Sequence, residues 1–512
     1  MNTGVVKKIS VVVLCCAMVH VSAKQMYREK TYLSRALPED NKALLWTGLA
    51  QQMDFISKKN VGTRVQARLI SSATDKDADF AQCFGVYNPA RNAVESFVGI
   101  DQNDAAEPLS SMSLIHDYAR ASGWYLGYGL RDRLSFRPQR RSWSVGFDLV
   151  QGFDRVFEGC SVRASIPYVI SRSYMNTASL IPDAHGMNLP GTGTPVTLLS
   201  YLAGDVANTD PGNKQDALKK LKFIKDELER KGVGDIELGL RARCWEHDGG
   251  HFDLGLVGII PSKYTPTGEF VSEPVLGNGG HIGLGIDGVL DMVLFEEGGG
   301  SLEFVVHADA RYLLPANEIR TPLFNDVQGN LLAYGAYQLG GKVGSAGMFP
   351  LANVLTREFK VSPGYRLDIS LAGIYSLQGF SVEFGAQAQA RSKEKVDIVE
   401  WDDDTIGVVQ WNYNATTAVT TANLWSTAGV GVDGVAFNAP SNLRTINRSS
   451  LNLDSITTPS SIQASLYGFV GYMYTSWRYP LNFGLGMMRD FALGSNVAAP
   501  SWNGWCKVGF TF

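Results

Sequence analysis

Charged side chains recur at every second position of several apolar runs, and these residues are the ones in this chain that could do chemistry. The clearest are Arg241, Arg243, Glu303, His307, Asp309, Arg311, Glu383 and Arg391. A wider set on the same faces adds Arg131, Asp148, Arg163, Glu237, Asp253, Asp287, Arg366, Asp368 and Lys507. Such groups can pair with one another, line a passage for polar solutes and form a constriction in it.

The motifs of known catalytic and cofactor sites do not extend this set. His307 lies next to Asp309 with no serine beside it on the strand, and the only His-x-Ser sequence is His20-Val21-Ser22. No GxSxG elbow or HExxH zinc motif occurs. A GxGxxG match at 283–288 falls inside an expected strand rather than between a strand and a helix. The sequence therefore predicts no catalytic residue, no enzyme activity and no cofactor.

Metal sites are not indicated either. His247 and His251 flank an expected hairpin turn, so their rings need not converge. The acidic run 402–404 lacks the ligand spacing of a calcium loop, and we expect it to form the solvent-exposed tip of a loop. The four cysteines beyond residue 23 are widely spaced, with no CxxC pair.

The elements that position the charges are strands. Apolar and polar residues alternate strictly over 236–245, 302–312 and 380–390, so successive side chains point to opposite faces. Runs of about ten residues match a tilted strand that crosses a membrane. Expected strands are 124–136, 142–153, 157–170, 234–246, 251–262, 280–295, 301–313, 365–376, 379–391, 461–475, 480–491 and 502–512. A further pair within 60–90, 331–344 or 405–437 would bring the number to 14.

Composition limits the alternatives. The chain has 512 residues, of which 54 are glycine, 45% are hydrophobic and 19% are charged, which excludes disorder and collagen. A formal net charge of −4 without a long basic run excludes nucleic acid as a partner.

The first residues predict export. Lys7 and Lys8 precede an apolar run at 9–21, and Val21-Ser22-Ala23 fits a cleavage site, so 1–23 reads as a signal peptide. No later run offers eighteen uncharged apolar residues, the length of a membrane helix.

Connection lengths fix the topology. Every second connection is short, and the long ones include 171–233, 314–364 and 392–460, which are expected as outer loops. The chain ends on the short-turn side, and Phe510 and Phe512 resemble the carboxy-terminal assembly signal of Gram-negative barrels. We therefore predict an all-β protein in the outer membrane of a Gram-negative-type bacterium: a transmembrane, antiparallel, up-and-down β-barrel of about 12 strands over residues 124–512.

Residues 24–123 differ in composition and are expected to form a plug in the lumen or a periplasmic extension, part helical at 38–56. A second helix is expected at 213–231, where Leu218, Leu221, Ile224 and Leu228 have helical spacing.

The segment 231–243, KGVGDIELGLRAR, resembles the "GlGD" segment of barrels that transport compounds of the phenol-degradation meta pathway, relatives of the fatty-acid channels. The following strand and its Pro-x-Gly loop at 254–268 resemble theirs too. The resemblance covers 234–295 and implies passage of small hydrophobic or aromatic compounds.

The sequence thus predicts a channel or transporter for passive passage of small solutes. Its expected partners are the solute, outer-membrane lipid, lipopolysaccharide and the barrel assembly machinery, and its oligomeric state stays open. The alternative is a structural or adhesin-type surface barrel with a closed lumen.

Overall fold

The computed structural model describes residues 44–45, 47, 62–74, 86–88, 93–98, 132–136, 138–153, 159–179, 187–188, 195–196, 198–207, 216–247, 249–262, 264–271, 273–325, 335–337, 339–342, 349–413, 420–424, 445–492 and 500–512. All structural observations concern these residues. The expected signal peptide and most of the expected helix at 38–56 lie outside them.

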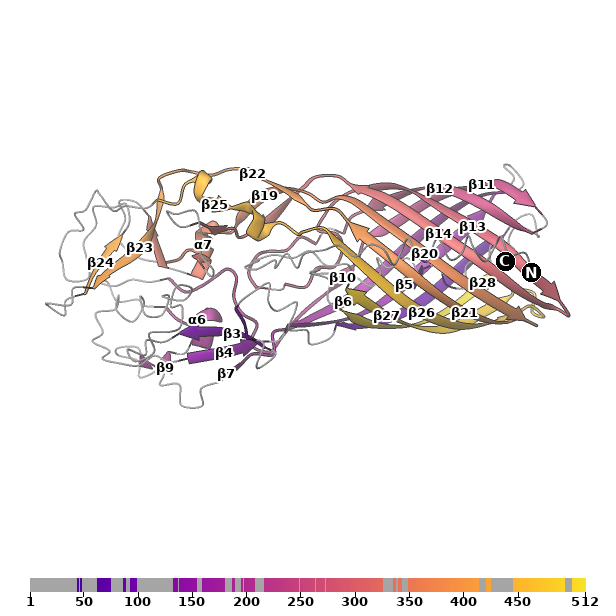
Figure 1. The fold of residues 1–512 in the computed structure, drawn as a ribbon, viewed down its shortest axis with the longest axis horizontal. Helices are drawn as coiled ribbons and strands as arrows, with labels where there is room; N and C mark the ends of the chain where they lie inside the picture. The colour runs from indigo at the N-terminus through magenta and orange to yellow at the C-terminus, as the bar shows by residue number, and fades with distance from the viewer. Residues whose placement is uncertain are drawn as a thin grey trace.

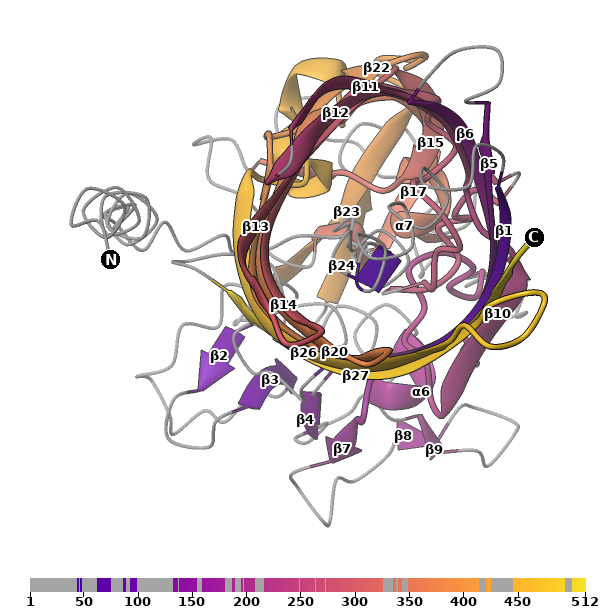
Figure 2. The same ribbon diagram turned by 90° about the vertical axis from the view of Figure 1, so that its right-hand side faces the viewer.

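Twelve antiparallel strands pair into a closed barrel (Figures 1 and 2). The ring runs β5-β6-β11-β12-β13-β14-β20-β21-β26-β27-β28-β1 and returns to β5. The strands are β1 (Thr63–Thr74), β5 (Gln139–Gly152), β6 (Cys160–Tyr174), β11 (Ile236–His247), β12 (Gly250–Ile260), β13 (Gly283–Glu297), β14 (Gly300–Leu313), β20 (Gly364–Leu377), β21 (Phe380–Arg391), β26 (Ser461–Tyr474), β27 (Leu481–Ala492) and β28 (Ser501–Thr511). The predicted all-β barrel is confirmed.

A thirteenth strand, β10 (Glu227–Val233), extends the ring at one place. It pairs with the C-terminal half of β6, at 168–174, and β11 pairs with the N-terminal half, at 160–165. Gly234, between β10 and β11, donates its backbone N–H to the Pro167 carbonyl at 2.8 Å, so the two strands together follow β6 beyond the barrel wall.

The barrel closes through β1, and this corrects the expected boundary at residue 124. β1 pairs with β28 on one side and β5 on the other. Thr63 and Phe512 exchange backbone hydrogen bonds of 2.7 and 2.9 Å at the end of the seam. The expected barrel strand 124–136 is wrong: residues 132–136 form β4 (Asp132–Phe136), which pairs with strands outside the barrel. All other expected strands lie in the ring.

The two faces of the barrel differ in the way that strand alternation requires. Outward side chains are apolar and exposed, such as Leu256 at 63% and Leu485 at 67%. The same face carries Trp143, Phe147, Leu240, Leu284, Ile286, Phe384, Leu466 and Met487. Inward side chains are mostly polar and buried. Because a charged side chain facing lipid at mid-depth costs about 2–4 kcal/mol, this division of faces fits a membrane-spanning barrel. Among the described residues, no helix has the length and apolar character needed to cross a membrane.

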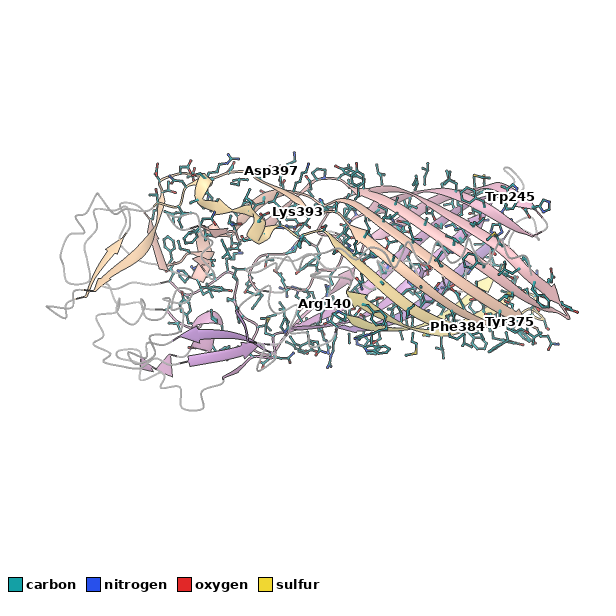
Figure 3. The ribbon with its side chains drawn as sticks, in the orientation of Figure 1. Arg140, Trp245, Tyr375, Phe384, Lys393 and Asp397 are labelled. Carbon is teal, nitrogen blue, oxygen red and sulfur yellow. The ribbon has the colours of Figure 1, made fainter. Side chains whose placement is uncertain are left out.

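Aromatic side chains gather at the end of the barrel where the hairpin turns are short. Phe510 packs edge-on against Trp477, and Phe512 against Tyr479, each with ring centroids 6.3 Å apart. Trp245 lies at the same end of the outer surface (Figure 3). Such rings of aromatic residues mark the edge of the apolar band in transmembrane barrels.

The long connections leave the opposite end and build a layer of small sheets beyond the barrel (Figure 1). One sheet is β15 (Ala316–Arg320), β19 (Arg357–Ser362) and β22 (Lys395–Ile398), and its core contains Phe359, Val361, Val396 and Ile456. The other strands are β2 (Val86–Asn88), β3 (Ala93–Val98), β7 (Ala178–Ser179), β8 (Met187–Asn188), β9 (Pro195–Val196), β16 (Leu323–Phe324), β17 (Leu339–Lys342), β18 (Phe349–Pro350), β23 (Ile406–Tyr413), β24 (Thr420–Leu424) and β25 (Leu451–Asn452). The helices are α6 (Leu198–Leu202), α7 (Ala352–Leu355) and the 3₁₀ turns η4 (Gly335–Tyr337), η6 (Arg448–Ser450) and η7 (Leu453–Ile456).

The expected helix at 213–231 is wrong for its described part. Residues 216–226 are irregular and 227–233 form β10. Leu221 and Lys222 donate their backbone N–H groups to the carbonyls of Gly268 and Glu269, at 3.0 and 2.8 Å. Leu218, Leu221 and Ile224 are buried, so their spacing serves packing against neighbouring loops rather than one face of a helix.

The place of β1 gives a direct prediction. A chain that begins at residue 62 keeps all twelve barrel strands, whereas one that begins at residue 124 leaves the edges of β5 and β28 without a partner. Unpaired backbone groups are not tolerated in lipid, so the first chain should refold in detergent micelles and the second should not. Heat-modifiable migration on gels reads out the result. Equal folding of both chains would contradict the closure through β1.

Candidate functional site

The charged side chains of the barrel interior meet across strands because small residues make room for them. Gly239 of β11 lies in register with Arg163 of β6, and a Cβ on this glycine would come 2.6 Å from Arg163 Nε. Gly146 of β5 likewise faces Arg68 of β1, whose side chain covers it. The arginines therefore lie flat across the wall and reach carboxylates on neighbouring strands.

One wall carries a continuous chain of ion pairs. Arg163 Nη2 donates to Glu237 Oε1 at 2.8 Å, and Arg311 Nη1 donates to Glu237 Oε2 at 2.7 Å. Arg311 also binds Asp309 on its own strand through two hydrogen bonds, of 2.5 and 2.8 Å. Glu237 thus joins β6 to β14 across the lumen face of β11, β12 and β13.

The chain continues toward the short-turn end through Asp287. Arg241 and Asp287 form a short ion pair, and Arg163 Nη1 lies 3.3 Å from the same carboxylate. Arg243 Nε donates to Asp253 at 2.9 Å, and its Nη1 lies 3.1 Å from Glu246. Because each buried charge has a partner of opposite sign, the cost of its removal from water is offset.

Two further groups of charged side chains lie on other strands of the barrel interior. Asp368 of β20 accepts from Arg366 Nε at 2.8 Å and from Gln389 Nε2 at 2.6 Å. On the other side of the barrel, Arg68 donates to Asp148 at 2.6 Å and to Ser165 at 2.9 Å. Asp309 and Asp368 are 1% and 0% exposed, so the side chains bound to them cover both carboxylates.

The opposite wall carries an apolar cluster among its polar side chains. Ile70, Tyr467, Phe469, Met488 and Trp505 form one buried cluster with Ala372, on strands β1, β20 and β26 to β28. Leu44, from the segment before the barrel, packs in the same cluster.

The N-terminal segment reaches into the barrel and is bound there by Lys507. The Nζ atom of this residue donates to the Thr47 carbonyl at 2.6 Å, to Thr47 Oγ1 at 2.9 Å and to the Leu45 carbonyl at 3.2 Å. Leu44 and Thr47 are buried.

A second charged cluster lies above the barrel mouth, in the long connections. Arg320, fully buried, donates to Glu318 Oε2 at 3.0 and 2.8 Å and to Glu394 Oε2 at 2.7 Å. His281 has both ring nitrogens on oxygen atoms: Nδ1 is 2.8 Å from the Leu314 carbonyl and Nε2 is 2.7 Å from Glu318 Oε1. Burial raises the pKa of the Glu318 carboxyl, but Arg320 and His281 outweigh it and bring the pKa below its ordinary value of 4.5.

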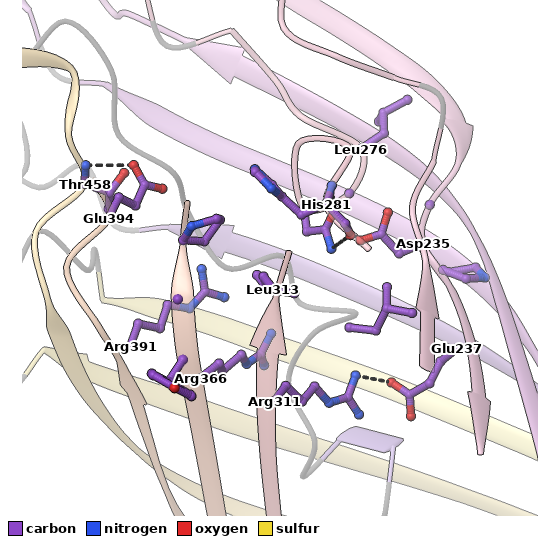
Figure 4. Close-up of a pocket in the computed structure, with 18 of the residues that line it drawn as sticks. Asp235, Glu237, Leu276, His281, Arg311, Leu313, Arg366, Arg391, Glu394 and Thr458 are labelled. Atoms are coloured by element: carbon purple, nitrogen blue, oxygen red, sulfur yellow. Dashed lines mark hydrogen bonds and ion pairs between the residues drawn. The ribbon is translucent and has the colours of Figure 1, made fainter. Parts of the chain in front are cut away.

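Between the lumen network and this cluster lies a cavity of about 1110 Å³, counted out to open solvent (Figure 4). Its polar lining includes Arg68, Glu237, His281, Arg311, Glu318, Arg366, Arg391 and Glu394, and its apolar lining includes Leu45, Ile259, Leu276 and Leu313.

The predicted site residues all lie on barrel strands, but they do not form one site. Arg241, Arg243, Asp309 and Arg311 belong to the ion-paired wall. Arg391 lines the cavity at the mouth. His307 is buried on β14. Glu303 accepts from Ser301 at 2.9 Å, and Glu383 accepts from Tyr467 at 3.2 Å beside the apolar cluster. Their role as the lining of a solute path stays a prediction.

Strand alternation could not find the cluster of His281, Glu318, Arg320 and Glu394, because these residues lie in connections and short outer strands with no face to assign. The one clue in the sequence is a concentration of charges just outside the ends of expected strands.

The candidate metal ligands are used otherwise. His247 is exposed and stacks on Trp245. His251 is buried, and its Nε2 atom lies 3.7 Å from Asp253 Oδ2. Asp403 accepts from the backbone N–H of Arg448 at 2.6 Å, so the acidic run 402–404 orders a turn. In the part of the chain that the structure describes, no group of three or more His, Cys, Asp or Glu residues is arranged to hold a metal ion.

A closed antiparallel barrel with an apolar outer face, an aromatic rim and a charged interior is the form in which strands cross a bilayer. The chain is a Gram-negative-type outer-membrane β-barrel. Since barrels of this kind have short periplasmic turns and longer extracellular loops, we expect its short-turn end to face the periplasm and the layer of small sheets to face outward.

No family model matches the chain, and no curated protein matches it. Among solved structures, it is similar to the COG4313 outer membrane channel from Pseudomonas putida F1, with 9% identity, a TM-score of 0.34 and coverage of 88% of this chain and 95% of that one. It is also similar to a Pseudomonas aeruginosa FadL homologue, with 8% identity, a TM-score of 0.27 and coverage of 88% and 90%. The CymD monoaromatic hydrocarbon channel has 10% identity, a TM-score of 0.24 and coverage of 96% and 98%. The barrel assignment rests on the strand pairing and the two faces of the barrel.

The ion-paired wall predicts a large effect of Asp287→Asn. The change leaves Arg241 buried without its carboxylate partner, and breaking a buried pair in this way costs about 3–5 kcal/mol. We expect a clear fall in the urea midpoint of the refolded barrel in micelles, followed by heat-modifiable migration. Asp397→Asn, at an exposed position on β22, is the control and should leave the midpoint unchanged. A midpoint for Asp287→Asn equal to that of the control would show that the wall does not depend on this pair.

The cluster around Glu318 predicts a dependence on acid. Because its pKa is lower in the folded state, the carboxylate stabilises the fold fully above the ordinary value of 4.5, and this contribution is lost as the pH falls through the lower folded value. Hydrogen exchange of β15, corrected for intrinsic rates, should therefore accelerate below about pH 4.5. In Glu318→Gln this acceleration should disappear. An identical pH profile in the two proteins would remove Glu318 as the cause.

Proposed function

We propose that the chain is an outer-membrane channel or transporter for passive passage of small solutes, with a lumen that its N-terminal segment keeps closed. The observation that carries the proposal is the charged interior with a cavity at its outer end. Replacing buried ion pairs by apolar residues is often neutral or stabilising. A barrel that served only as a structural element would not need its many buried charges.

The plug is the part of residues 24–123 that lies inside the barrel. Lys507 binds the backbone at residues 45 and 47, and Leu44 fills the apolar cluster, so the segment is held by both a charged and an apolar contact. The described residues of this segment, 44, 45 and 47, are held by hydrogen bonds and packing, and both can be exchanged for contacts with a solute.

The two walls support a solute class. The apolar cluster with Tyr467, Phe469 and Trp505 offers flat aromatic surfaces, and the opposite wall offers charged groups. Small hydrophobic or aromatic compounds, the class implied by the resemblance of 231–243, would slide along the first wall once the segment with Leu44 has moved.

The proposed partners follow from the outer surface. The apolar belt takes outer-membrane lipid, and the extracellular rim takes lipopolysaccharide. Phe510 and Phe512 are 40% and 56% exposed at the periplasmic end, where the barrel assembly machinery would read them.

A structural or adhesin-type barrel is the second candidate. The ion pairs between lumen side chains favour it, because charges that neutralise one another need no solute, and the extracellular sheets offer surface for adhesion.

Planar-bilayer recordings of the refolded mature chain decide between the two. Lys507→Met removes the charged hydrogen bonds to the plug, each of the kind that contributes about 1.5–3 kcal/mol. We therefore expect rare discrete openings in the native chain and an open fraction at least about tenfold higher in Lys507→Met.

Lys342→Met, at an exposed position at the end of β17, serves as the matched control and should behave like the native chain. A chain without residues 24–61 should be open most of the time. If all four proteins insert in folded form and remain silent, the channel proposal fails and the structural barrel stands.

A further inference from the structure

Three arginines stand side by side on the wall of the cavity at the outer mouth. In the strand register, Arg311 of β14 is the direct partner of Arg366 of β20, and Arg366 is the direct partner of Arg391 of β21. All three line the cavity, and Figure 4 shows them in a row, with His281 across from them. We call these residues the arginine row.

Such a row is costly by itself, since like charges directly opposite each other destabilise a sheet. Two of its members have carboxylates on their own strands: Arg311 binds Asp309 at 2.5 Å and Arg366 binds Asp368 at 2.8 Å. Both carboxylates lie two residues along the strand from their arginines, further from the mouth. Arg311 also binds Glu237, which lines the cavity, so its charge is balanced from both sides. Asp368, the carboxylate bound to Arg366, lies on the side away from the mouth.

The carboxylates on the opposite side of the cavity are engaged with another cation. Glu318 and Glu394 both bind Arg320, at 2.8 and 2.7 Å, and Glu394 also accepts from the Thr458 backbone N–H at 2.9 Å. Glu318 holds His281 as well. Glu318 and Glu394 are thus both bound to Arg320, and Arg366 and Arg391 line the cavity beside each other.

An apolar surface adjoins the row. Leu313, at the end of β14, lies next to Arg311 and Arg366 in Figure 4, and Leu276 lies on the far side. Leu45 of the N-terminal segment lines the same cavity. The cavity therefore offers a cationic edge and an apolar edge, the combination found in sites for small organic molecules.

We propose that this cavity binds small organic anions, with the carboxylate on Arg366 and Arg391 and the apolar body against Leu276 and Leu313. Planar guanidinium groups bind carboxylates through paired hydrogen bonds, so two neighbouring arginines recognise such a group well. The inference rests on the proposed function, because it makes the cavity the entry site of the channel. Contact of the bound anion with Leu45 would link solute binding to the N-terminal segment.

Calorimetric titration of the refolded full chain in detergent tests the site, with benzoate as the probe. Benzyl alcohol has the same ring without the charge, and chloride has the charge without the ring. We expect benzoate to bind at least about tenfold more tightly than either. Arg391→Gln should weaken benzoate about tenfold or more, and Arg391→Lys less, because it keeps the charge but loses the planar fork. Arg478→Gln, in an exposed periplasmic turn, is the control and should bind like the native chain.

Equal binding of benzoate and benzyl alcohol, or of benzoate and chloride, would overturn the organic-anion site, as would unchanged affinity in folded Arg391→Gln. This test is independent of conduction. If benzoate binds as expected but no protein conducts, the cavity stands and the channel proposal falls. If the plug variants conduct but benzoate binding does not depend on Arg391, the channel stands and this site falls.

Discussion

The requirement that every backbone N–H and C=O within a bilayer find a partner in the protein governs the whole structure. A sheet can meet it only by closing on itself. Here closure depends on the seam between β28 and β5, which β1 fills with paired backbone on both sides. The hydrogen bonds between Thr63 and Phe512 join the beginning and the end of the ring. Once the ring is closed, strand alternation sends one set of side chains to lipid and the other to the lumen.

Closure then determines the chemistry of the interior. Charges that lipid would reject are concentrated in the lumen, and they must neutralise one another there. Glu237, shared by Arg163 and Arg311, shows how this is achieved: a single carboxylate joins arginines from two strands. The apolar cluster around Trp505 occupies the part of the lumen that the N-terminal segment enters through Leu44. The interior therefore has an ion-paired wall on one side and, on the other, an apolar cluster that the N-terminal segment contacts.

Strand positions and faces followed from the sequence because period two is a strong local pattern and each strand crosses the whole apolar layer. The same rule placed Arg241 and Arg311 inward. The sequence leaves β1 open as part of a further pair within 60–90, because the alternation of 64–69 ends at Ile70, an apolar residue on the lumen side, which two serines follow. The segment 132–136 was misplaced for the opposite reason: it alternates, but it pairs outside the membrane. At 216–226 the leucine spacing matched a helix, while the actual hydrogen bonds go to residues 268–271, which no local pattern reports.

The same limit applies to the site. Alternation tells which side chains enter the lumen, but it does not tell which of them share a level, because that depends on the stagger between strands. The register places Arg311, Arg366 and Arg391 side by side, although their spacing in the sequence gives no hint of it. It also leaves Glu303 and Glu383, each the direct partner of Ile374, near the apolar wall and away from the arginines. The chemistry of such a lumen therefore depends on which charges lie at the same depth, and the stagger between strands determines this. The number of charges alone does not. Its outer level is the one where arginines gather around open space.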